Sequence, residues 1–369
     1  MTRAARLLVS GYYGFGNAGD EAVLGGLVEG FRAAGADVEL IVLSGDPEAT
    51  ESEHGVRAVP RRLTSVHRWA RHSDLLVSGG GGLLQDTTSL WSPLYYLGVM
   101  RLARAAGAPV ACLGHGIGPL RRSLARFLTR RVLSRVEAIT VRDQASYEAL
   151  RELGVKRDVE VTADLAFLLP APSREESDAA WRKAGLPEDD RPTAAIALRH
   201  PPEGEQARFV PTLTRAISKA VEQLGLRPVL LPMHRGRDEQ LAGECARALP
   251  PGAGVVTQRM WARELLALVA RCDLMIGMRL HAIIFAAICG VPAVAISYHP
   301  KVDALMQQLG LQTATSVQQF DPSALSHAIY ETWRTRAEVS ALLHSRAEQL
   351  RQAAARNVQH ALRLLAGDS

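Results

Sequence analysis

The sequence predicts an α/β protein made of two doubly wound, Rossmann-like domains that face a cleft. Short apolar segments alternate regularly with amphipathic ones, which is typical of βαβ units and of a parallel sheet covered on both faces. This alternation begins anew near residue 193. The chain has 369 residues, a length that suits two domains.

The first series contains short aliphatic runs of strand length. They predict strands at residues 6–10, 38–43, 74–78, 109–113 and 138–141. Helical spacing of apolar residues predicts helices between them at residues 20–34, 94–106 and 120–133. This series defines an N-terminal domain over residues 1–170.

The second series repeats the pattern. It predicts strands at residues 194–198, 228–231, 274–277 and 292–296 and helices at residues 206–224, 237–249, 263–270 and 279–288. Four prolines within residues 168–192, together with a mixed-charge stretch, indicate a linker at residues 171–192, part of which is compatible with a helix. The C-terminal domain is then residues 193–369, with one or two long helices over residues 322–365.

Composition excludes several classes of protein. Hydrophobic residues make up 47% of the chain and charged residues 22%, which argues against disorder. The net charge is +5, from 43 basic and 38 acidic residues, and we expect no nucleic acid as a partner. The mild excess suits anionic substrates or an anionic membrane surface. No signal peptide or membrane-length apolar run is visible, so we expect a cytoplasmic protein with at most peripheral membrane contact.

Glycine-rich segments follow three of the first-domain strands. Such segments let backbone N–H groups approach a ligand closely, although residues 11–21 are also compatible with a helix cap and residues 79–86 with tight strand–helix packing. In residues 114–119 a histidine is either a cleft group or a structural one. The candidate residues are Gly14, Asn17, Asp20, Glu21, Gly81 and His115.

Basic residues follow strands in both halves. Arg142 is either half of a pair with Asp143 or a ligand for an anion, and Arg199 ends the first strand of the second domain. Arg279 and His281 stand where a strand ends and a helix begins, a natural seat for a small anion with proton chemistry beside it. Lys301 follows the next strand. We see neither metal-ligand spacing nor a nucleotide-binding motif, and we expect no metal and no cofactor.

Taken together, these segments resemble the polysaccharide pyruvyl transferases, most closely the bacterial cell-wall, CsaB-like branch of that family. The matching segments are residues 11–21, 79–86, 114–119, 141–143, 278–282 and 298–302. The resemblance implies a fold like the two-domain glycosyltransferases of type B, with the N-terminal domain (residues 1–170) on the acceptor side and the C-terminal domain (residues 193–369) on the donor side. It also implies transfer of pyruvate from phosphoenolpyruvate to a sugar as a cyclic ketal, with release of phosphate. The implied acceptor is N-acetylmannosamine on a lipid-linked cell-wall polysaccharide precursor, and such a ketal resembles the anchor that S-layer homology domains recognise.

The resemblance also implies roles for individual residues. It assigns catalysis to His281, Arg142 and Lys301, and donor binding to Arg279, with Leu280 and Arg199 beside it. These residue types suit the chemistry, because arginine and lysine bind carboxylate and phosphate oxygens and an imidazolium can protonate the methylene carbon of the donor. Deprotonation of the acceptor hydroxyl is left open among Asp20, Glu21 and His115.

Two other functions are compatible with the same residues. One is a nucleotide-sugar-dependent glycosyltransferase of the same fold, since fold alone does not decide function. The other is a non-catalytic protein that binds sugar or phosphate. For the pyruvyl transferase, the expected partners are phosphoenolpyruvate and a lipid-linked saccharide at the inner face of the plasma membrane. The sequence leaves the oligomeric state open, a homo-oligomer included.

Overall fold

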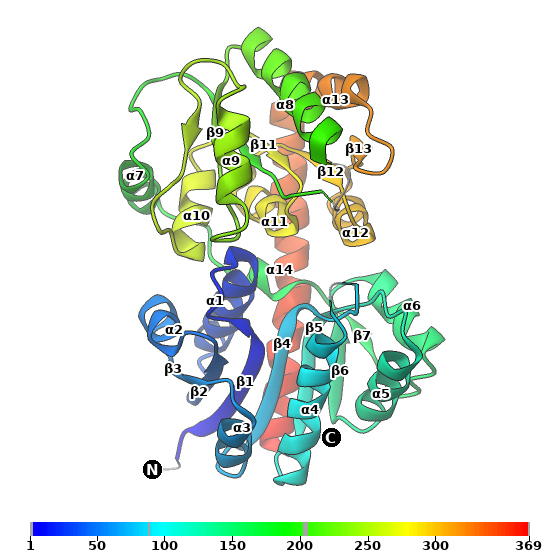
Figure 1. The fold of residues 1–369 in the computed structure, drawn as a ribbon. Coiled ribbons are helices and arrows are strands. Elements are labelled where there is room, and N and C mark those ends of the chain that lie inside the picture. Colours follow the sequence, from blue (N-terminus) through cyan, green and yellow to red (C-terminus); the bar gives the residue numbers. More distant parts are fainter. Residues whose placement is uncertain (1–2, 88, 202–205, 368–369) are drawn as a thin grey trace. The chain divides into compact units, whose positions relative to one another are not determined.

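The structure is a computed structural model that describes residues 3–87, 89–201 and 206–367 (Figure 1). The chain forms two compact units, the first from Met1–Leu169 with Leu350–Ser369 and the second from Pro170–Gln349. Each unit is a parallel sheet with helices, which confirms the predicted pair of doubly wound domains. The predicted second domain of residues 193–369 needs correction, because residues 350–369 return to the first unit.

The sheet of the first unit has the strand order β3-β2-β1-β4-β5-β6-β7, and all its recorded pairings are parallel. Its strands are β1 (Ala5–Tyr13), β2 (Val38–Ser44), β3 (Arg57–Pro60), β4 (Leu75–Leu84), β5 (Val110–Ile117), β6 (Ala138–Val141) and β7 (Glu160–Val161). The strand order reverses between β1 and β4, and ligands of such sheets bind beyond the carboxyl ends of the strands at this switch point.

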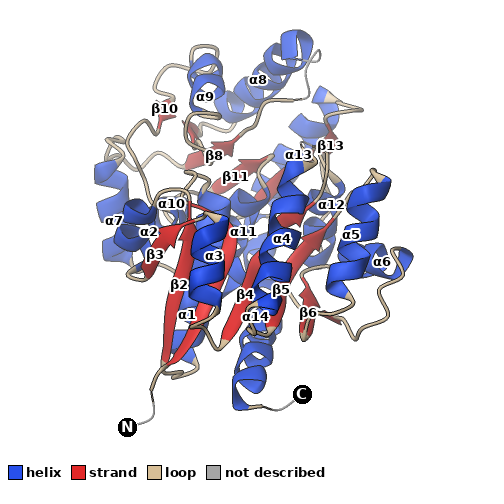
Figure 2. Cartoon of the chain, turned by 60° about the horizontal axis from the view of Figure 1, so that its bottom comes forward, coloured by secondary structure: helices blue, strands red, loops and turns tan. Residues whose placement is uncertain are grey.

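Helices cover both faces of this sheet (Figure 2). They are α1 (Ala18–Ala33), α2 (Pro47–His54), α3 (Leu63–Ala70), α4 (Trp91–Ala105), α5 (Ser123–Leu133), α6 (Gln144–Glu152) and the 3₁₀ helix η1 (Leu165–Leu168). Helices α3, α4 and α5 share one buried core with the central strands. Helix α1 packs instead with η1 and with the end of the last helix, where Gly30 lies against Val358.

The last helix, α14 (Arg336–Ala366), starts in the second unit and ends in the first. Its fully buried Asn357 explains this return. The amide of Asn357 accepts hydrogen bonds from the hydroxyls of Thr140 and Thr162 and donates one to the carbonyl of Ala163 at 3.3 Å. A buried amide without these partners would cost free energy, so it fixes the end of the helix to β6 and β7.

Three strands of the first unit are longer than predicted. Strands β1, β4 and β5 continue through residues 11–13, 79–84 and 114–117, which the sequence analysis assigned to loops. The extension of β4 is paired with β5, since Gly81 stands opposite His115 and Leu84 opposite Ile117. Glycine is a poor strand former by propensity, but parallel neighbours supply the hydrogen-bond partners that hold it here.

The second unit has a smaller sheet, with the strand order β10-β9-β8-β11-β12-β13 and parallel pairings. Its strands are β8 (Thr193–Ala197), β9 (Arg227–Leu230), β10 (Gly254–Val255), β11 (Leu274–Gly277), β12 (Ala293–Ser297) and β13 (Thr315–Ser316). Its helices besides α14 are α7 (Arg174–Lys183), α8 (Gln206–Gln223), α9 (Glu239–Ala246), α10 (Ala262–Val269), α11 (Leu280–Cys289), α12 (Pro300–Gln308) and α13 (Pro322–Arg334). Helices α8, α9 and α13 share a core with the central strands, while α7 packs with α10 and α10 with α11.

Part of the predicted linker is a helix. Helix α7 lies inside it and begins with a capping box, in which the side chains of Ser173 and Glu176 each accept a hydrogen bond from the other's backbone N–H. It belongs to the second unit, so the first boundary between the units lies between Leu169 and Pro170, and the second lies within α14, between Gln349 and Leu350.

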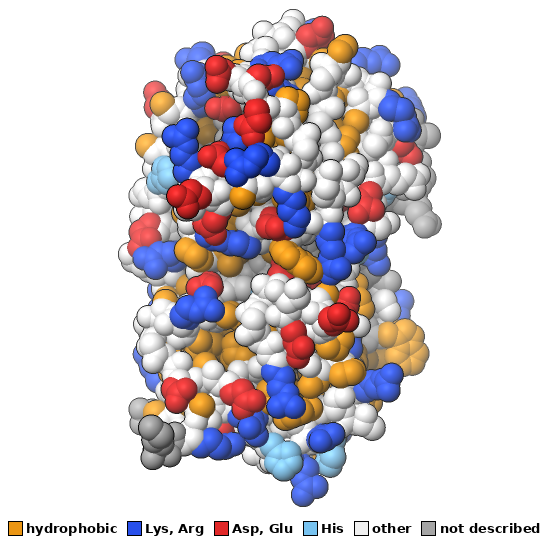
Figure 3. Space-filling model, turned by 90° about the vertical axis from the view of Figure 1, so that its left-hand side faces the viewer, with side chains coloured by type: hydrophobic (Ala, Val, Ile, Leu, Met, Phe, Trp, Pro, Cys, Tyr) orange, Lys and Arg blue, Asp and Glu red, His pale blue; other side chains and the backbone are white. Residues whose placement is uncertain are grey.

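The remaining features of the fold are the distribution of charge on the surface and the apolar character of the helices. Figure 3 shows basic and acidic side chains intermingled over the face that it draws, in line with the near balance of charge over the whole chain. Among the helices that the structure describes, none combines the length and the apolar character needed to cross a membrane.

Candidate functional site

The carboxyl edge of the second sheet gathers basic side chains. Because the strands are parallel and the order runs β9-β8-β11-β12, the residues that follow these four strands leave the sheet at the same edge. These residues include Arg199 and His200 after β8, His234 after β9, Arg279 and His281 after β11, and His299 and Lys301 after β12. This edge is therefore suited to an anionic ligand.

An aromatic ring joins two of these cations. The guanidinium carbon of Arg199 lies 4.0 Å from the ring centroid of Tyr298, and the ammonium of Lys301 lies 5.2 Å from the same centroid. Strand β11 separates β8 from β12 in the sheet, so Tyr298 brings together groups from strands that are not neighbours. Both distances are within the range of cation–π attraction.

The pKa of the Tyr298 hydroxyl also reflects the two neighbouring cations. Burial of the side chain raises its pKa, but the charges of Lys301 and Arg199 and their hydrogen bonds to the hydroxyl outweigh burial, so the pKa of Tyr298 lies below its usual value. A site that stabilises a phenolate also stabilises other small anions.

The start of α11 carries the next two candidates. Arg279 is the residue before the helix, and its side chain makes no capping hydrogen bond to the first turn. The side chain of Leu280 is buried in the core, so only its backbone N–H is available to a ligand at the start of the helix. His281, in the first turn, is half-buried. The first turn of a helix presents N–H groups and the positive end of the dipole, and it therefore favours an anion.

Arg279 is held in place by a nearly fully buried carboxylate. Its guanidinium forms an ion pair with Asp238, whose other oxygen accepts the backbone N–H groups of Met233 at 3.2 Å and His234 at 2.9 Å. The side chain of His234 is buried beside this pair, and its pKa is lowered, chiefly by burial. The loop after β9 thus fixes the direction of Arg279.

The glycine-rich segment of the first unit ends in a capped helix. Asn17 is the N-cap of α1 and accepts the N–H of Gly19 at 3.2 Å, and its side-chain amide also contacts Asp20. Asp20 is partly exposed, and one of its oxygens lies 3.1 Å from where a Cβ on Gly81 would stand. Gly81 has φ +76°, which disfavours other residues, so the candidates Asp20 and Gly81 do lie side by side.

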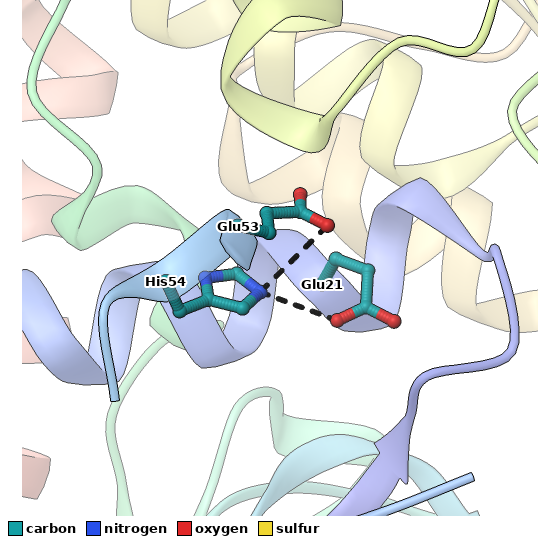
Figure 4. Close-up of side chains that lie close together, drawn as sticks. All are labelled: Glu21, Glu53 and His54. Atoms are coloured by element: carbon teal, nitrogen blue, oxygen red, sulfur yellow. Dashed lines mark hydrogen bonds and ion pairs between the residues drawn. The ribbon is translucent and has the colours of Figure 1, made fainter. Parts of the chain in front are cut away.

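Glu21 has a different environment. It is buried and accepts the N–H of Gly14 at 2.8 Å, which ties the glycine-rich segment to α1. Its other oxygen lies 3.2 Å from the imidazole of His54, which is also 4.0 Å from a carboxylate oxygen of Glu53 (Figure 4). One ligand atom from each of these three residues lies within 4.8 Å of the others, but an imidazole shared by two carboxylates accounts for the same contacts.

His115 is fully buried in β5 rather than placed in an open loop. One ring nitrogen lies 3.0 Å from both the carbonyl and the hydroxyl oxygen of Ser78, and the other is buried with no hydrogen-bond partner among the residues that the structure describes. Burial lowers the pKa of His115 to about 4, and the charge of Arg142 acts in the same direction. The imidazole is therefore neutral near pH 7 and has no exposed surface.

Arg142 is buried in the first unit and lies between two carboxylates. Its guanidinium contacts Asp143 at 3.2 Å and Asp164 at 3.2 Å. Burial disfavours the charged form, but Asp164 and Asp143 outweigh it and raise the pKa of Arg142. A Cβ on Gly116 would stand 2.6 Å from this guanidinium, so glycine is needed for the group to fit.

The structure thus unites some candidates and separates others by environment. Arg199 and Lys301 meet at Tyr298, and Asp20 meets Gly81, whereas Glu21, His115 and Arg142 are buried and engaged within the first unit. The sequence analysis did not single out Tyr298, Asp238, Asp164 or His54. His54 and Glu21 are 33 residues apart, and neither motif nor spacing connects them.

Comparison with known proteins gives three kinds of similarity. A family model described as polysaccharide pyruvyl transferase matches residues 17–300. The amylovoran biosynthesis protein AmsJ of Erwinia amylovora is 26% identical, over 85% of this chain and 88% of its own length. Among solved structures, a putative UDP-N-acetylglucosamine 2-epimerase of Listeria monocytogenes has a TM-score of 0.66 at 9% identity, covering 100% of this chain and 98% of its own. A glycosyltransferase of Rickettsia africae has a TM-score of 0.65 at 11% identity, and the match covers 100% of both chains. At such low identity, the similarity of this chain to these two structures shows the fold alone.

Proposed function

Because the chain belongs to the polysaccharide pyruvyl transferase family and is a pyruvate-transferring enzyme, we propose that its donor is phosphoenolpyruvate, held by the second unit. The carrying observation is that Arg199 and Lys301 both lie against the ring of Tyr298, at the sheet edge from which α11 also starts. Phosphoenolpyruvate bears a carboxylate and a phosphate, and arginine and lysine bind such oxygens by charge-assisted hydrogen bonds.

Each second-unit residue takes a role that its place supports. Arg199 and Lys301 bind the donor's negative groups, and Lys301 stabilises phosphate as it leaves. Arg279, directed by Asp238, adds a fork for the carboxylate, and the backbone of Leu280 at the helix start adds an N–H donor. His281 in its imidazolium form protonates the methylene carbon.

The proposed reaction balances without an outside reagent. One sugar hydroxyl forms a bond to the central carbon of the donor while the methylene carbon gains a proton from His281. The bond between the central carbon and the phosphate oxygen then breaks, which releases phosphate. The second sugar hydroxyl bonds to the same central carbon and closes the ring. The two hydroxyls lose two protons. One restores the imidazolium of His281, whose own proton now resides in the new methyl group, and the other leaves with the phosphate as hydrogen phosphate.

Among the three candidates for the acceptor side, Asp20 is best placed to take a hydroxyl proton. It is the partly exposed carboxylate of its segment, whereas Glu21 and His115 are buried and engaged. We assign Gly14, Asn17 and Gly81 to the shape of that segment. Arg142 takes a supporting role in this proposal, because two carboxylates of its own unit balance its charge.

The proposed acceptor is a lipid-linked saccharide at the inner face of the plasma membrane, with N-acetylmannosamine as the first sugar to test. The name of AmsJ assigns that relative to the synthesis of amylovoran, which makes an exopolysaccharide precursor the alternative acceptor. A role in a secondary cell-wall polysaccharide that anchors S-layer proteins depends on the first of these acceptors.

Mass spectrometry tests the reaction. A lipid-linked disaccharide that ends in N-acetylmannosamine and one that ends in a neutral hexose are each incubated with enzyme and phosphoenolpyruvate. We expect a gain of one pyruvate less one water on one acceptor, with one phosphate released per product. A parallel incubation with nucleotide sugars tests the glycosyltransferase alternative, and a sugar added from that donor in place of pyruvate would overturn the proposal.

A further inference from the structure

One segment of the first unit is strongly basic, although the chain as a whole is nearly balanced. Residues 87–136 contain eight arginines and no lysine, aspartate or glutamate. Six of these arginines lie in and around α5, namely Arg121, Arg122, Arg126, Arg130, Arg131 and Arg135, and all six are exposed.

Helix α5 also exposes large apolar side chains. Its inner side buries Ala125, Val132 and Leu133 in the core of the first unit. On its outer side, Leu124 is 49% exposed and Phe127 is 50% exposed. These two residues are three apart, so they lie on the same face of the helix. Exposed apolar side chains among arginines on the outer face of a helix indicate a binding surface, because the core of the unit does not bury them.

The basic side chains frame a hollow at the end of α5. An open pocket of about 450 Å³ is lined by Phe127 and by the cations Arg130, Arg131, Arg135, Lys156 and Arg157. Within the described part of the chain, no ion pair joins any of these five cations to a carboxylate.

The acidic residues that bound this segment in sequence are engaged elsewhere. Asp86 is buried and accepts the backbone N–H groups of Arg121 and Arg122, at 2.8 and 2.7 Å. Glu137 pairs with Arg104 at 3.3 Å and accepts the N–H of Val110. The charge around α5 is therefore left for a partner.

We propose that the outer face of α5, together with residues 154–157, docks on an anionic phospholipid membrane. We call this the α5 surface. Its arginines and Lys156 match the phosphates of anionic headgroups, and Leu124 and Phe127 match the acyl region just beneath them. Trp91, at the start of the neighbouring helix α4, is 79% exposed and adds an amphipathic ring of the kind that favours membrane interfaces. This proposal rests on the first unit alone and stands or falls independently of the donor.

A nucleic acid or a soluble polyanion is the competing partner for a basic surface. Such a partner satisfies the cations through its phosphates or sulfates but gives no burial to an aliphatic side chain such as Leu124. The combination of exposed leucine and phenylalanine with clustered arginine therefore favours a membrane. The two partners also differ in what their binding depends on, because only a membrane requires the apolar side chains.

Vesicle co-sedimentation of the full chain tests the proposal. Vesicles of phosphatidylcholine mixed with the anionic lipid phosphatidylglycerol are compared with vesicles of pure phosphatidylcholine. We expect binding to the anionic vesicles only. The variant Arg131→Glu/Arg135→Glu should reduce the partition coefficient at least tenfold, and Leu124→Ser/Phe127→Ser should reduce it several-fold at the same ionic strength.

The controls separate this surface from general electrostatics and from unfolding. Arg208→Glu/Arg215→Glu makes the same charge change at exposed positions of α8 in the second unit and should leave binding near the wild-type level. Melting curves of all variants verify the fold. Equal binding to both vesicle types, no loss in Arg131→Glu/Arg135→Glu, or an unchanged Leu124→Ser/Phe127→Ser would each overturn the proposal. Tighter binding to a single-stranded DNA oligonucleotide than to the anionic vesicles, at the same salt, would assign the surface to nucleic acid instead.

Discussion

The carboxyl edges of the two sheets treat their charged residues in opposite ways. In the first unit, Arg142 is buried between Asp143 and Asp164, and His115 is buried and uncharged. In the second unit, Arg199 and Lys301 are half-buried around Tyr298. A cation held between two buried carboxylates supports structure, whereas cations gathered around one ring are prepared for an anion. Arg279 is intermediate, because a single carboxylate, that of Asp238, holds it at the second edge. The difference supports the proposed place of the donor in the second unit and leads to five predictions.

The largest expected effect is on turnover in His281→Ala. Loss of the proton donor should lower the rate of pyruvate transfer roughly 100- to 10,000-fold, the usual contribution of a general acid. Phosphate release measures the rate, and the melting temperature should stay the same. His327→Ala removes an exposed histidine from α13 of the same unit and should be active. A near wild-type rate in His281→Ala would remove the proton donor from the second unit.

Arg142→Ala should instead destabilise the protein. It leaves Asp143 and Asp164 buried without their cation, at a cost of about 3–5 kcal/mol in the free energy of unfolding. Urea unfolding measures this, and the exposed Arg62→Ala is the control. If Arg142→Ala were as stable as wild type but had lost turnover, Arg142 would be a catalytic residue. The contrast drawn here between the two sheet edges would then be wrong.

His115 gives the first unit a pH dependence. Its pKa is about 4 in the folded chain and 6.5 in the unfolded one, so below pH 6.5 the unfolded state binds a proton that the folded state refuses. Stability should therefore fall as the pH drops from 6.5 toward 4, by on the order of 3 kcal/mol from this residue.

Urea unfolding between pH 4 and pH 7 measures the effect. The slope should flatten in His115→Asn, whatever that variant does to stability at pH 7. It should persist in His72→Asn, which removes an exposed histidine of the same unit. Equal slopes in wild type and His115→Asn would show that the imidazole is accessible to protons in the folded state.

Lys301→Ala should weaken use of the donor. Loss of one charged hydrogen bond costs about 1.5–3 kcal/mol, or roughly a tenfold to hundredfold rise in the KM for phosphoenolpyruvate. The KM for the acceptor should stay unchanged, and Lys219→Ala on α8 provides an exposed lysine of the same unit as control. A rise confined to the acceptor KM would contradict the assignment of the second unit to the donor.

The smallest expected effect is on donor binding when Tyr298 is changed, and two variants distinguish the contribution of its ring from that of its hydroxyl. Tyr298→Leu removes the surface that Arg199 and Lys301 share and should weaken donor binding by about 0.5–2 kcal/mol, while Tyr298→Phe keeps the ring and most of the affinity. Calorimetric titration with phosphoenolpyruvate compares them. Equal losses in both variants would move the role from the ring to the hydroxyl.

Much of the fold was predictable because it depends on local periodicity. The strands Ala138–Val141 and Leu274–Gly277 have the predicted bounds, since each is a short apolar run ended by a polar or flexible residue. Tertiary partners decide what periodicity misses. The glycines after residue 78 pair with β5 and become strand, and Asn357 returns the last helix to the first unit through hydrogen bonds to residues about 200 positions earlier.

The candidate site was predictable in part for the same reason. Residues that follow parallel strands must leave the sheet at one edge, so the convergence of basic groups there was foreseeable. Whether each group is free for a ligand was not, because this depends on partners such as Asp164 for Arg142 and His54 for Glu21. Tyr298 was overlooked since nothing in the sequence shows a ring lying between two cations.

Hydrogen–deuterium exchange of the full chain, with and without saturating phosphoenolpyruvate, tests the assignment of the donor most directly. We predict that the donor slows exchange at the residues that follow β8, β11 and β12, around Arg199, Leu280 and Lys301. Slower exchange confined to the glycine-rich segment and to the region around Arg142, or no change at all, would contradict the account.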